Sequence, residues 1–258
     1  MKKEFMSSLS QVFAMVELEF RRIIHDPTEL ITRAIQPILW LVVFGGVMGR
    51  AGVFTNLIKT DYITYITPGV ILQSATFIAL AYGIMLVFER DSGILKRLLA
   101  SPISRLKIIL GRALAGATRA SFQYLIIIPL AFLIGAKISN SPINLILGYI
   151  LLTYGSMGFT AISIAIAALL KTRERFMGII GAIVMPLYFA SNALYPLEIM
   201  PEWVKVIAQY NPLTYIVSSL RKLLLFNSFD ISTEIIALTI FNIISIVLAS
   251  KLLSRIIE

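Results

Sequence analysis

The chain has 258 residues, of which 58% are hydrophobic and 14% charged, with a mean hydropathy of +0.86. Because soluble domains average about 45–50% apolar and roughly 25% charged residues, this composition excludes an ordinary soluble protein and indicates an integral membrane protein. The formal net charge of +9 is not arranged as a basic stripe with interleaved aromatic residues, which argues against a nucleic-acid partner.

Residues 5 to 24 predict an amphipathic helix that is too polar to span a bilayer. Apolar residues recur there at three- and four-residue steps, while Glu17 and Arg21 are spaced i,i+4 on the other face. Asp26-Pro27 ends the pattern, and no cleaved signal peptide is expected before it. We assign residues 1–27 to a helix in the cytoplasmic membrane interface, with packing against other protein as the alternative.

Six later segments each have the length and apolar character of a membrane-spanning helix, which needs about 20 residues. They are 31–49, 66–88, 113–136, a stretch within 144–170, 176–197 and 235–250. The sequence therefore predicts an all-α membrane protein with six transmembrane helices, and residues 1–258 form a single transmembrane domain.

The distribution of Lys and Arg predicts the orientation of these spans. Sixteen of these residues fall at the two termini and in the loops on the same side, six fall on the opposite side, and Arg119 lies within the third span. Because short positively charged loops stay in the cytoplasm, both termini are expected to be cytoplasmic, in the inner (cytoplasmic) membrane of the cell.

Residues 196–229 are the least regular part of the predicted membrane region. Prolines and the Asn211-Pro212 pair break the chain, and the apolar run that follows contains Arg221 and Lys222. This run is too short and too charged for a seventh span, so we predict a re-entrant or interfacial pair of short helices on the outer side.

The residue inventory argues against catalysis by this chain. One histidine, His25, and the absence of cysteine make a metal site or catalytic triad implausible. The six predicted spans contain no Asp or Glu, which disfavours a proton- or sodium-coupled carrier. No P-loop motif occurs, so any ATP and Mg²⁺ would be bound by a separate subunit, and this chain is expected to bind no cofactor of its own.

Three ordered motifs point to a family. The stretch 88–105, FERDSGILKRLLASPISR, resembles the E-R-x-x-G-x-x-x-x-L-x-x-x-P pattern between the second and third spans of type-2 ABC exporter permeases. Arg22 to Pro27, followed by Pro37 and Gly45-Gly46, is similar to that family's entry into the first span. Residues 194–203 and 211–221 resemble its pattern before the last span, although Lys96 stands where members often carry an acid.

The resemblance implies the permease subunit of an ATP-driven exporter, which works with an ABC nucleotide-binding subunit and with a second copy of itself. It implies that 89–107 is a cytoplasmic coupling loop, whose short helix has Leu95, Leu98 and Leu99 on one apolar side. The first, second and fifth spans would line or close the path. The expected coupling residues are Glu89, Arg90, Asp91, Gly93, Leu98 and Pro102. The expected outer-gate residues are Pro196, Pro201, Asn211, Pro212 and Arg221.

The cargo and the exact assembly stay open at this point. The family's range of cargo and the apolar spans favour an amphipathic or lipid-like molecule such as a drug, lipid or glycolipid. A homodimer and a heterodimer both fit the sequence. The alternatives to an exporter are a secondary carrier and a membrane assembly or immunity protein without transport activity.

Overall fold

The computed structural model describes residues 2–26, 28–52, 57–58, 60–101, 103–170 and 172–254, and within these ranges all regular structure is helical. The expected all-α class is therefore confirmed. The helices in chain order are α1 (Lys2–His25), α2 (Thr28–Leu39), the π-helical turn Trp40–Phe44, α3 (Gly45–Arg50), α4 (Tyr62–Ala81), α5 (Ile84–Asp91), α6 (Ile94–Leu99), α7 (Arg105–Ile134), α8 (Pro142–Leu169), α9 (Arg173–Phe189), the 3₁₀ turn Leu197–Ile199, α10 (Glu202–Tyr210), α11 (Pro212–Leu224) and α12 (Ser232–Ser254).

Five helical stretches among the described residues are long and apolar enough to cross a membrane, which makes this a multipass membrane protein. They are Ile31–Arg50, Tyr62–Asp91, Arg105–Ile134, Pro142–Leu169 and Ser232–Leu253. The fifth predicted span, 176–197, corresponds to α9, which has 17 residues and ends at Phe189. At about 1.5 Å per residue α9 is roughly 25 Å long, slightly less than the hydrocarbon core, so a sixth crossing stays a prediction.

The second predicted span is divided into α4 and α5 at Tyr82-Gly83. α4 begins before the predicted start because the Asp61 carboxylate caps it, accepting from the Thr64 backbone N–H at 3.0 Å. At the break, the Gly83 N–H donates to the Ser163 hydroxyl of α8 at 2.8 Å. A Cβ on Gly83 would lie 2.5 Å from the Ser163 carbonyl oxygen, so only glycine permits this close approach.

The core lies where α4, α7 and α8 pack together, with α11 and α12 against α8. Ile66, Ile71 and Leu72 on α4 are fully buried, whereas Ile35 on α2 and Ile236 on α12 are exposed on the outside of the bundle. α4 is therefore the central helix, and α2 and α12 present apolar surface to the surroundings.

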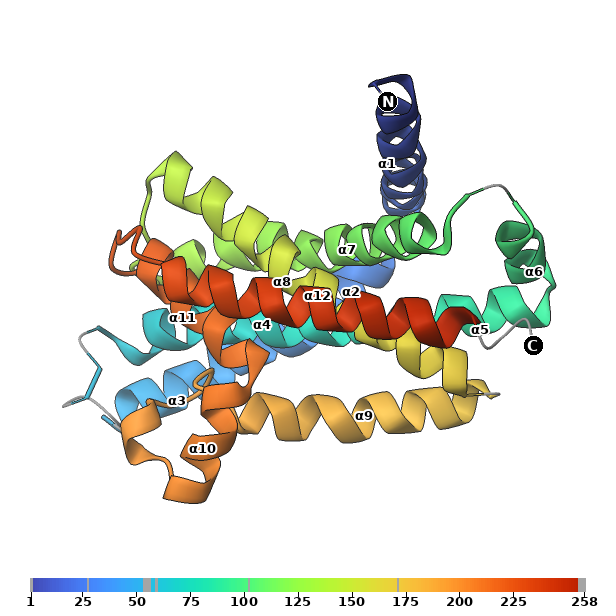
Figure 1. The fold of residues 1–258 in the computed structure, drawn as a ribbon. Helices are drawn as coiled ribbons and strands as arrows, with labels where there is room; N and C mark the ends of the chain where they lie inside the picture. Colours follow the sequence, from blue (N-terminus) through green and yellow to red (C-terminus); the bar gives the residue numbers. More distant parts are fainter. Residues whose placement is uncertain are drawn as a thin grey trace.

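The bundle has two distinct ends, which we name after their short helices. At one, the α6 end, lie α6, the beginning of α7 and the beginning of α9, while α10 and the start of α11 lie at the other, the α10 end (Figure 1). The predicted coupling residues and the predicted outer-gate residues are thus at opposite ends, as the expected topology requires.

α1 runs across the direction of the long helices and packs against α7 (Figure 1). Glu19 on α1 is only 1% exposed and forms an ion pair with Arg119 of α7. Arg22 lies 3.5 Å from the same carboxylate, while Glu17 and Arg21 pair at 2.7 Å on the exposed face, as their spacing predicts. Arg119, the charge that the sequence places within a span, is therefore neutralised by α1, and one face of α1 packs against protein.

We predict that Glu19→Gln destabilises the protein by about 3 kcal/mol, because it leaves the Arg119 guanidinium without its buried counter-charge. The measurement is unfolding of the purified protein in detergent micelles. The matched control is Glu17→Gln, which removes an exposed i,i+4 pair on the same helix and should change stability by no more than about 0.5 kcal/mol. Equal effects of the two substitutions would contradict the role given to Glu19.

Candidate functional site

The predicted coupling segment forms a tight turn between two helices. α5 ends at Asp91, and Gly93 adopts a left-handed conformation with φ of +73° before α6 begins. A residue with a side chain would be strained in this conformation, which explains the glycine in the motif. Pro102 lies outside the described residues.

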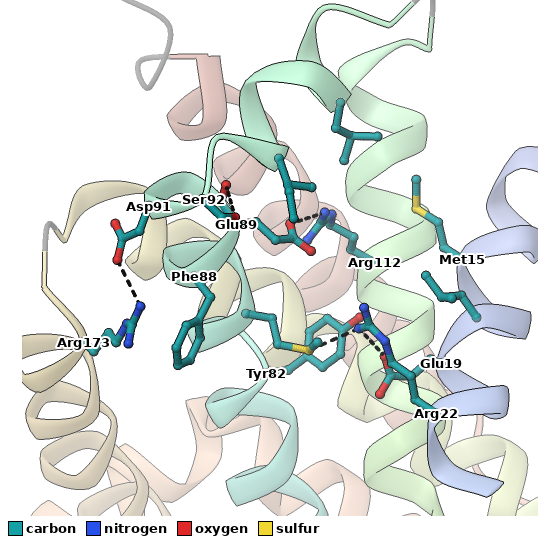
Figure 2. A pocket seen from close by; sticks show the side chains of 14 residues that line it. Met15, Glu19, Arg22, Tyr82, Phe88, Glu89, Asp91, Ser92, Arg112 and Arg173 are labelled. Carbon is teal, nitrogen blue, oxygen red and sulfur yellow. Dashed lines mark hydrogen bonds and ion pairs between the residues drawn. The ribbon is translucent and has the colours of Figure 1, made fainter. Parts of the chain in front are cut away.

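A cavity of about 900 Å³ opens at the α6 end (Figure 2). Its walls come from α1, α5, α6, α7 and α9, and three of the expected coupling residues, Glu89, Asp91 and Leu98, line it. Neither Gly93 nor Arg90 is among the lining residues. Three of the six expected coupling residues are thus on one concave surface.

Ion pairs connect the cavity wall on α5 to two neighbouring helices (Figure 2). Glu89 pairs with Arg112 of α7, and both side chains are largely buried. Asp91 lies 3.5 Å from Arg173 of α9, whose guanidinium stacks 3.7 Å from the centroid of the Phe88 ring. Charged contacts therefore link α5 to both α7 and α9.

The short helix α6 uses its apolar side to attach to the bundle. Leu95 is fully buried, whereas Ile94 and Leu98 both line the cavity. Ile94 is 53% exposed, and Lys96 and Arg97 are also exposed. The exposed side chains of α6 are thus Ile94, Lys96 and Arg97. The sequence pattern alone did not indicate that this face of α6 is the exposed one.

At the α10 end, the expected outer-gate prolines stand at helix starts. Pro196 precedes the 3₁₀ turn, Pro201 precedes α10, and Pro212 is the first residue of α11. Pro196 is buried, whereas Pro201 is exposed. Proline suits these positions because a helix start needs no backbone N–H from it.

Asn211 and Arg221 are brought together on the turn that follows α9. The Asn211 amide donates to the carbonyl oxygens of Leu187 at 2.7 Å and Ala190 at 2.9 Å, and its side-chain oxygen caps α11 by accepting from the Leu213 N–H at 3.0 Å. Every hydrogen-bonding group of this side chain except one lone pair therefore has a named partner. Asn211 joins α11 to the end of α9.

Arg221 is 6% exposed and lies between α4 and the same turn. It donates to the carbonyl oxygens of Tyr65 at 3.2 Å and Ala193 at 3.0 Å, and its guanidinium lies 3.6 Å from the centroid of the Tyr65 ring. Burial lowers the pKa of Arg221 to about 10, which leaves the guanidinium charged at neutral pH. Two of its partners are backbone carbonyls, which leave no signal in a sequence.

Comparison with known proteins shows the family of the chain. Residues 10–225 match the family described as ABC-2 type transporter. The chain belongs to this family. It is 30% identical to the putative transport permease ycf38 of Cyanophora paradoxa, with 96% of this chain and 90% of the relative covered.

Two further relatives have names that refer to drugs. The daunorubicin resistance ABC transporter permease protein DrrB1 of Streptomyces coeruleorubidus is 23% identical, with 78% of this chain and 70% of that protein covered. The probable multidrug ABC transporter permease YbhR of Escherichia coli (strain K12) is 26% identical, with 60% of this chain and 42% of that protein covered. The family indicated by the sequence motifs is thus confirmed for this permease.

We predict that Asn211→Ala destabilises this ABC-2 permease by about 2 kcal/mol, because it removes the cap of α11 and two hydrogen bonds to buried carbonyls. The measurement is again unfolding in detergent. Gln209→Ala is the control, since Gln209 is exposed on the neighbouring helix α10, and its loss should leave stability within about 0.5 kcal/mol of the parent. An unchanged midpoint for Asn211→Ala would contradict its role as the joint between α9 and α11.

Proposed function

We propose that this chain is the permease subunit of an ATP-driven exporter and that a separate ABC nucleotide-binding subunit, which carries ATP and Mg²⁺, docks at the α6 end. The observation that carries the proposal is the connection of α5, at the start of the coupling segment, to two neighbouring helices. Glu89 and Asp91 tie α5 to α7 and α9, so movement of the docked subunit would shift all three. This chain itself performs no catalysis.

The docking surface and the transmitting residues are separate in this proposal. The exposed residues Ile94, Lys96 and Arg97 of α6 contact the ATPase subunit, and Ile94 also lines the cavity. Glu89 and Asp91 transmit the displacement, and Gly93 permits the turn between α5 and α6. Arg90 and Pro102 are assigned to the same coupling function by the motif alone.

The α10 end serves as the outer gate. Residues 196–229 close the bundle there through hydrogen bonds from Asn211 and Arg221 to backbone carbonyls. Such contacts can exchange for water or for other carbonyls when the gate opens, and no covalent or metal link has to break. Pro196, Pro201 and Pro212 limit the conformations that the connecting segments adopt.

A second copy of the chain completes the path. α9 buries one stripe, Phe176, Ile180, Val184 and Tyr188, and leaves the opposite side exposed. On that side Gly178 and Gly181 have open space beyond them, which permits close approach of another helix. We infer a homodimer with the cargo path between the copies, lined or closed by α2, α4 and α9.

The cargo is amphipathic or lipid-like, because the spans offer mainly apolar surface and relatives are named for resistance to daunorubicin and doxorubicin.

A secondary carrier is disfavoured since the acids near span ends, Glu89 and Glu234, pair with Arg112 and Lys222. Transport by the chain alone along an ion gradient would establish that alternative. Reconstituted complexes that hydrolyse ATP without moving any cargo would favour an assembly or immunity protein.

Substitutions that add or reverse a charge separate docking of the ATPase subunit from transmission of its movement. We expect Ile94→Asp to reduce co-purification of the ATPase subunit by at least tenfold, whereas Glu89→Arg should retain association and lose cargo-stimulated ATP hydrolysis. The double variant Glu89→Arg with Arg112→Glu should regain part of that stimulation, because the ion pair is restored with reversed sign. Lys205→Glu at the α10 end is the control. Normal coupling in Glu89→Arg, or association unaffected by Ile94→Asp, would contradict the proposal.

Both termini are proposed to be cytoplasmic, and the absence of cysteine permits a direct test. In intact cells, a membrane-impermeant maleimide should label Ser228→Cys, between α11 and α12, without permeabilisation. Ser254→Cys should react only after permeabilisation. Labelling of Ser254→Cys from outside would overturn the proposed topology.

A further inference from the structure

The wall of the cavity at the α6 end includes a cation whose hydrogen-bonding capacity the protein uses only in part. Arg22 of α1 lines this cavity, and 43% of its side chain is exposed. Its guanidinium contacts a Glu19 oxygen at 3.5 Å and the Met85 sulfur at 3.8 Å, and Nη1 makes both contacts. The Nε and Nη2 atoms of Arg22 donate to no acceptor among the described residues.

Glu19 does not neutralise Arg22, because the same carboxylate already serves a second cation. Glu19 is 1% exposed, and its other oxygen pairs with Arg119 of α7. Two guanidinium groups therefore share one buried carboxylate, which leaves one positive charge in excess. The excess lies on Arg22, since the side chain of Arg119 is only 14% exposed. A guanidinium with unused donors suits a phosphate or carboxylate from outside the chain.

Tyr82 provides a second donor beside Arg22. It follows the last residue of α4, is partly exposed and lines the same cavity. Its side chain points toward Arg22 and Glu19 (Figure 2), and its hydroxyl has no hydrogen-bond partner among the described residues. The Tyr82 hydroxyl and the unused N–H groups of Arg22 can therefore donate to the same anion.

The other charges of the cavity wall are paired with one another. Glu89 pairs with Arg112, and Asp91 pairs with Arg173. Asp91 and Arg173 lie at the α9 side of the cavity, whereas Arg22 lies at the α1 side (Figure 2). Each carboxylate of α5 thus has its own cation, and an anion at Arg22 meets no unpaired acid.

Apolar side chains form the rest of the lining, which we name the apolar wall. They are Met15, Leu18, Met85, Phe88, Ile94 and Leu98. The cavity volume of about 900 Å³ is within the range of about 300–1,000 Å³ that is typical of small-molecule sites. Donors for an anion beside such a wall favour an acidic head group that is joined to a hydrocarbon chain.

α1 borders the cavity on the side that faces the membrane surface in the proposed topology. It runs across the long helices (Figure 1) and exposes Phe13, Phe20 and Ile24, although another face packs against α7. An amphipathic helix with such a face lies among lipid head groups. Leu18 of α1 is 53% exposed and also lines the cavity, so lipids around α1 are next to the opening. The cytoplasmic leaflet is the one that carries anionic lipids.

We propose that Arg22 and Tyr82 bind the phosphate of an anionic phospholipid from the cytoplasmic leaflet, whose acyl chain lies along the apolar wall. A lipid bound there contacts α1, α5 and α6 together and so holds α1 against the coupling segment. The assignment to the cytoplasmic leaflet rests on the proposed function, whereas the binding site stands on the unused donors and the apolar wall.

Binding is tested on the purified, delipidated permease alone in dodecyl maltoside micelles. The probe is phosphatidylglycerol with a fluorescent NBD group on one acyl chain. We expect saturable binding about tenfold tighter than that of phosphatidylcholine with the same label, because the site has one excess positive charge. Arg22→Met and Tyr82→Phe should each weaken binding of phosphatidylglycerol about tenfold, since each removes a hydrogen bond to a charged group. Equal affinity for the two lipids would overturn the proposal.

The neighbouring arginine provides a matched control. Arg21 has the same charge on the same helix, but it pairs with Glu17 and does not line the cavity. Arg21→Met should therefore bind phosphatidylglycerol as the parent does, and Tyr210→Phe, which alters an exposed tyrosine at the α10 end, should do the same. An equal loss of affinity in Arg21→Met and Arg22→Met would show attraction by overall charge alone and would overturn the site.

Thermal unfolding separates binding from structure. Without lipid, Arg22→Met should leave the midpoint unchanged, because Glu19 still pairs with Arg119. Added phosphatidylglycerol should raise the midpoint of the parent and of Arg21→Met but not that of Arg22→Met, since a ligand stabilises the state that binds it. A lower midpoint of Arg22→Met together with unchanged affinity for the probe would make Arg22 a structural residue and overturn the proposal.

Competition identifies the occupant of the cavity. Unlabelled phosphatidylglycerol should displace the probe, whereas inorganic phosphate at the same concentration and the purified ATPase subunit should not. Displacement by inorganic phosphate would assign the donors to a free anion, and displacement by the ATPase subunit would assign the cavity to that subunit. Either result would overturn the lipid proposal. Failure of the parent chain to bind the ATPase subunit would contradict the proposed function while leaving the lipid measurement intact.

Discussion

The arrangement of this permease depends on the cost of burying charge in an apolar bundle. A cation within or beside a span needs a counter-charge or several carbonyl oxygens. Three buried or partly buried arginines, Arg119, Arg112 and Arg221, each have such a partner among the described residues. Glu19 meets Arg119, Glu89 meets Arg112, and backbone carbonyls meet Arg221. These contacts join α1 to α7, α5 to α7, and α11 to α4 and the turn after α9.

The same stretch of chain takes part in both functional ends. Tyr65 near the start of α4 accepts from Arg221 at the α10 end, and Glu89 near the end of α5 pairs with Arg112 at the α6 end. Between them the helix is interrupted once, at Gly83, where the backbone bonds to Ser163. α4 and α5 together therefore join the two ends, and the interruption between them lies at a close approach of α8.

Much of the site could be predicted because its signals are local in the sequence. Gly93 stands where the chain needs a positive φ, and Asn211-Pro212 carries both a cap and a first helical residue, so these positions follow from short-range chemistry. Glu19 could not be predicted, because its importance comes from Arg119, a residue 100 positions away. The count of charges groups Arg33 with the cytoplasmic loops. Only the folded structure shows that it lines a cavity.

Composition and hydropathy by themselves determined that this is a helical membrane protein, and the ordered motifs determined its family, because both properties are carried by residue types and short spacings. Tertiary structure decided which face of α6 is available, where α9 ends, and that α1 packs against α7 through Glu19 and Arg119. These features depend on which helix surfaces meet. A period of 3.6 residues shows that a helix has an apolar face, whereas the neighbour that covers this face is chosen by packing across the whole chain.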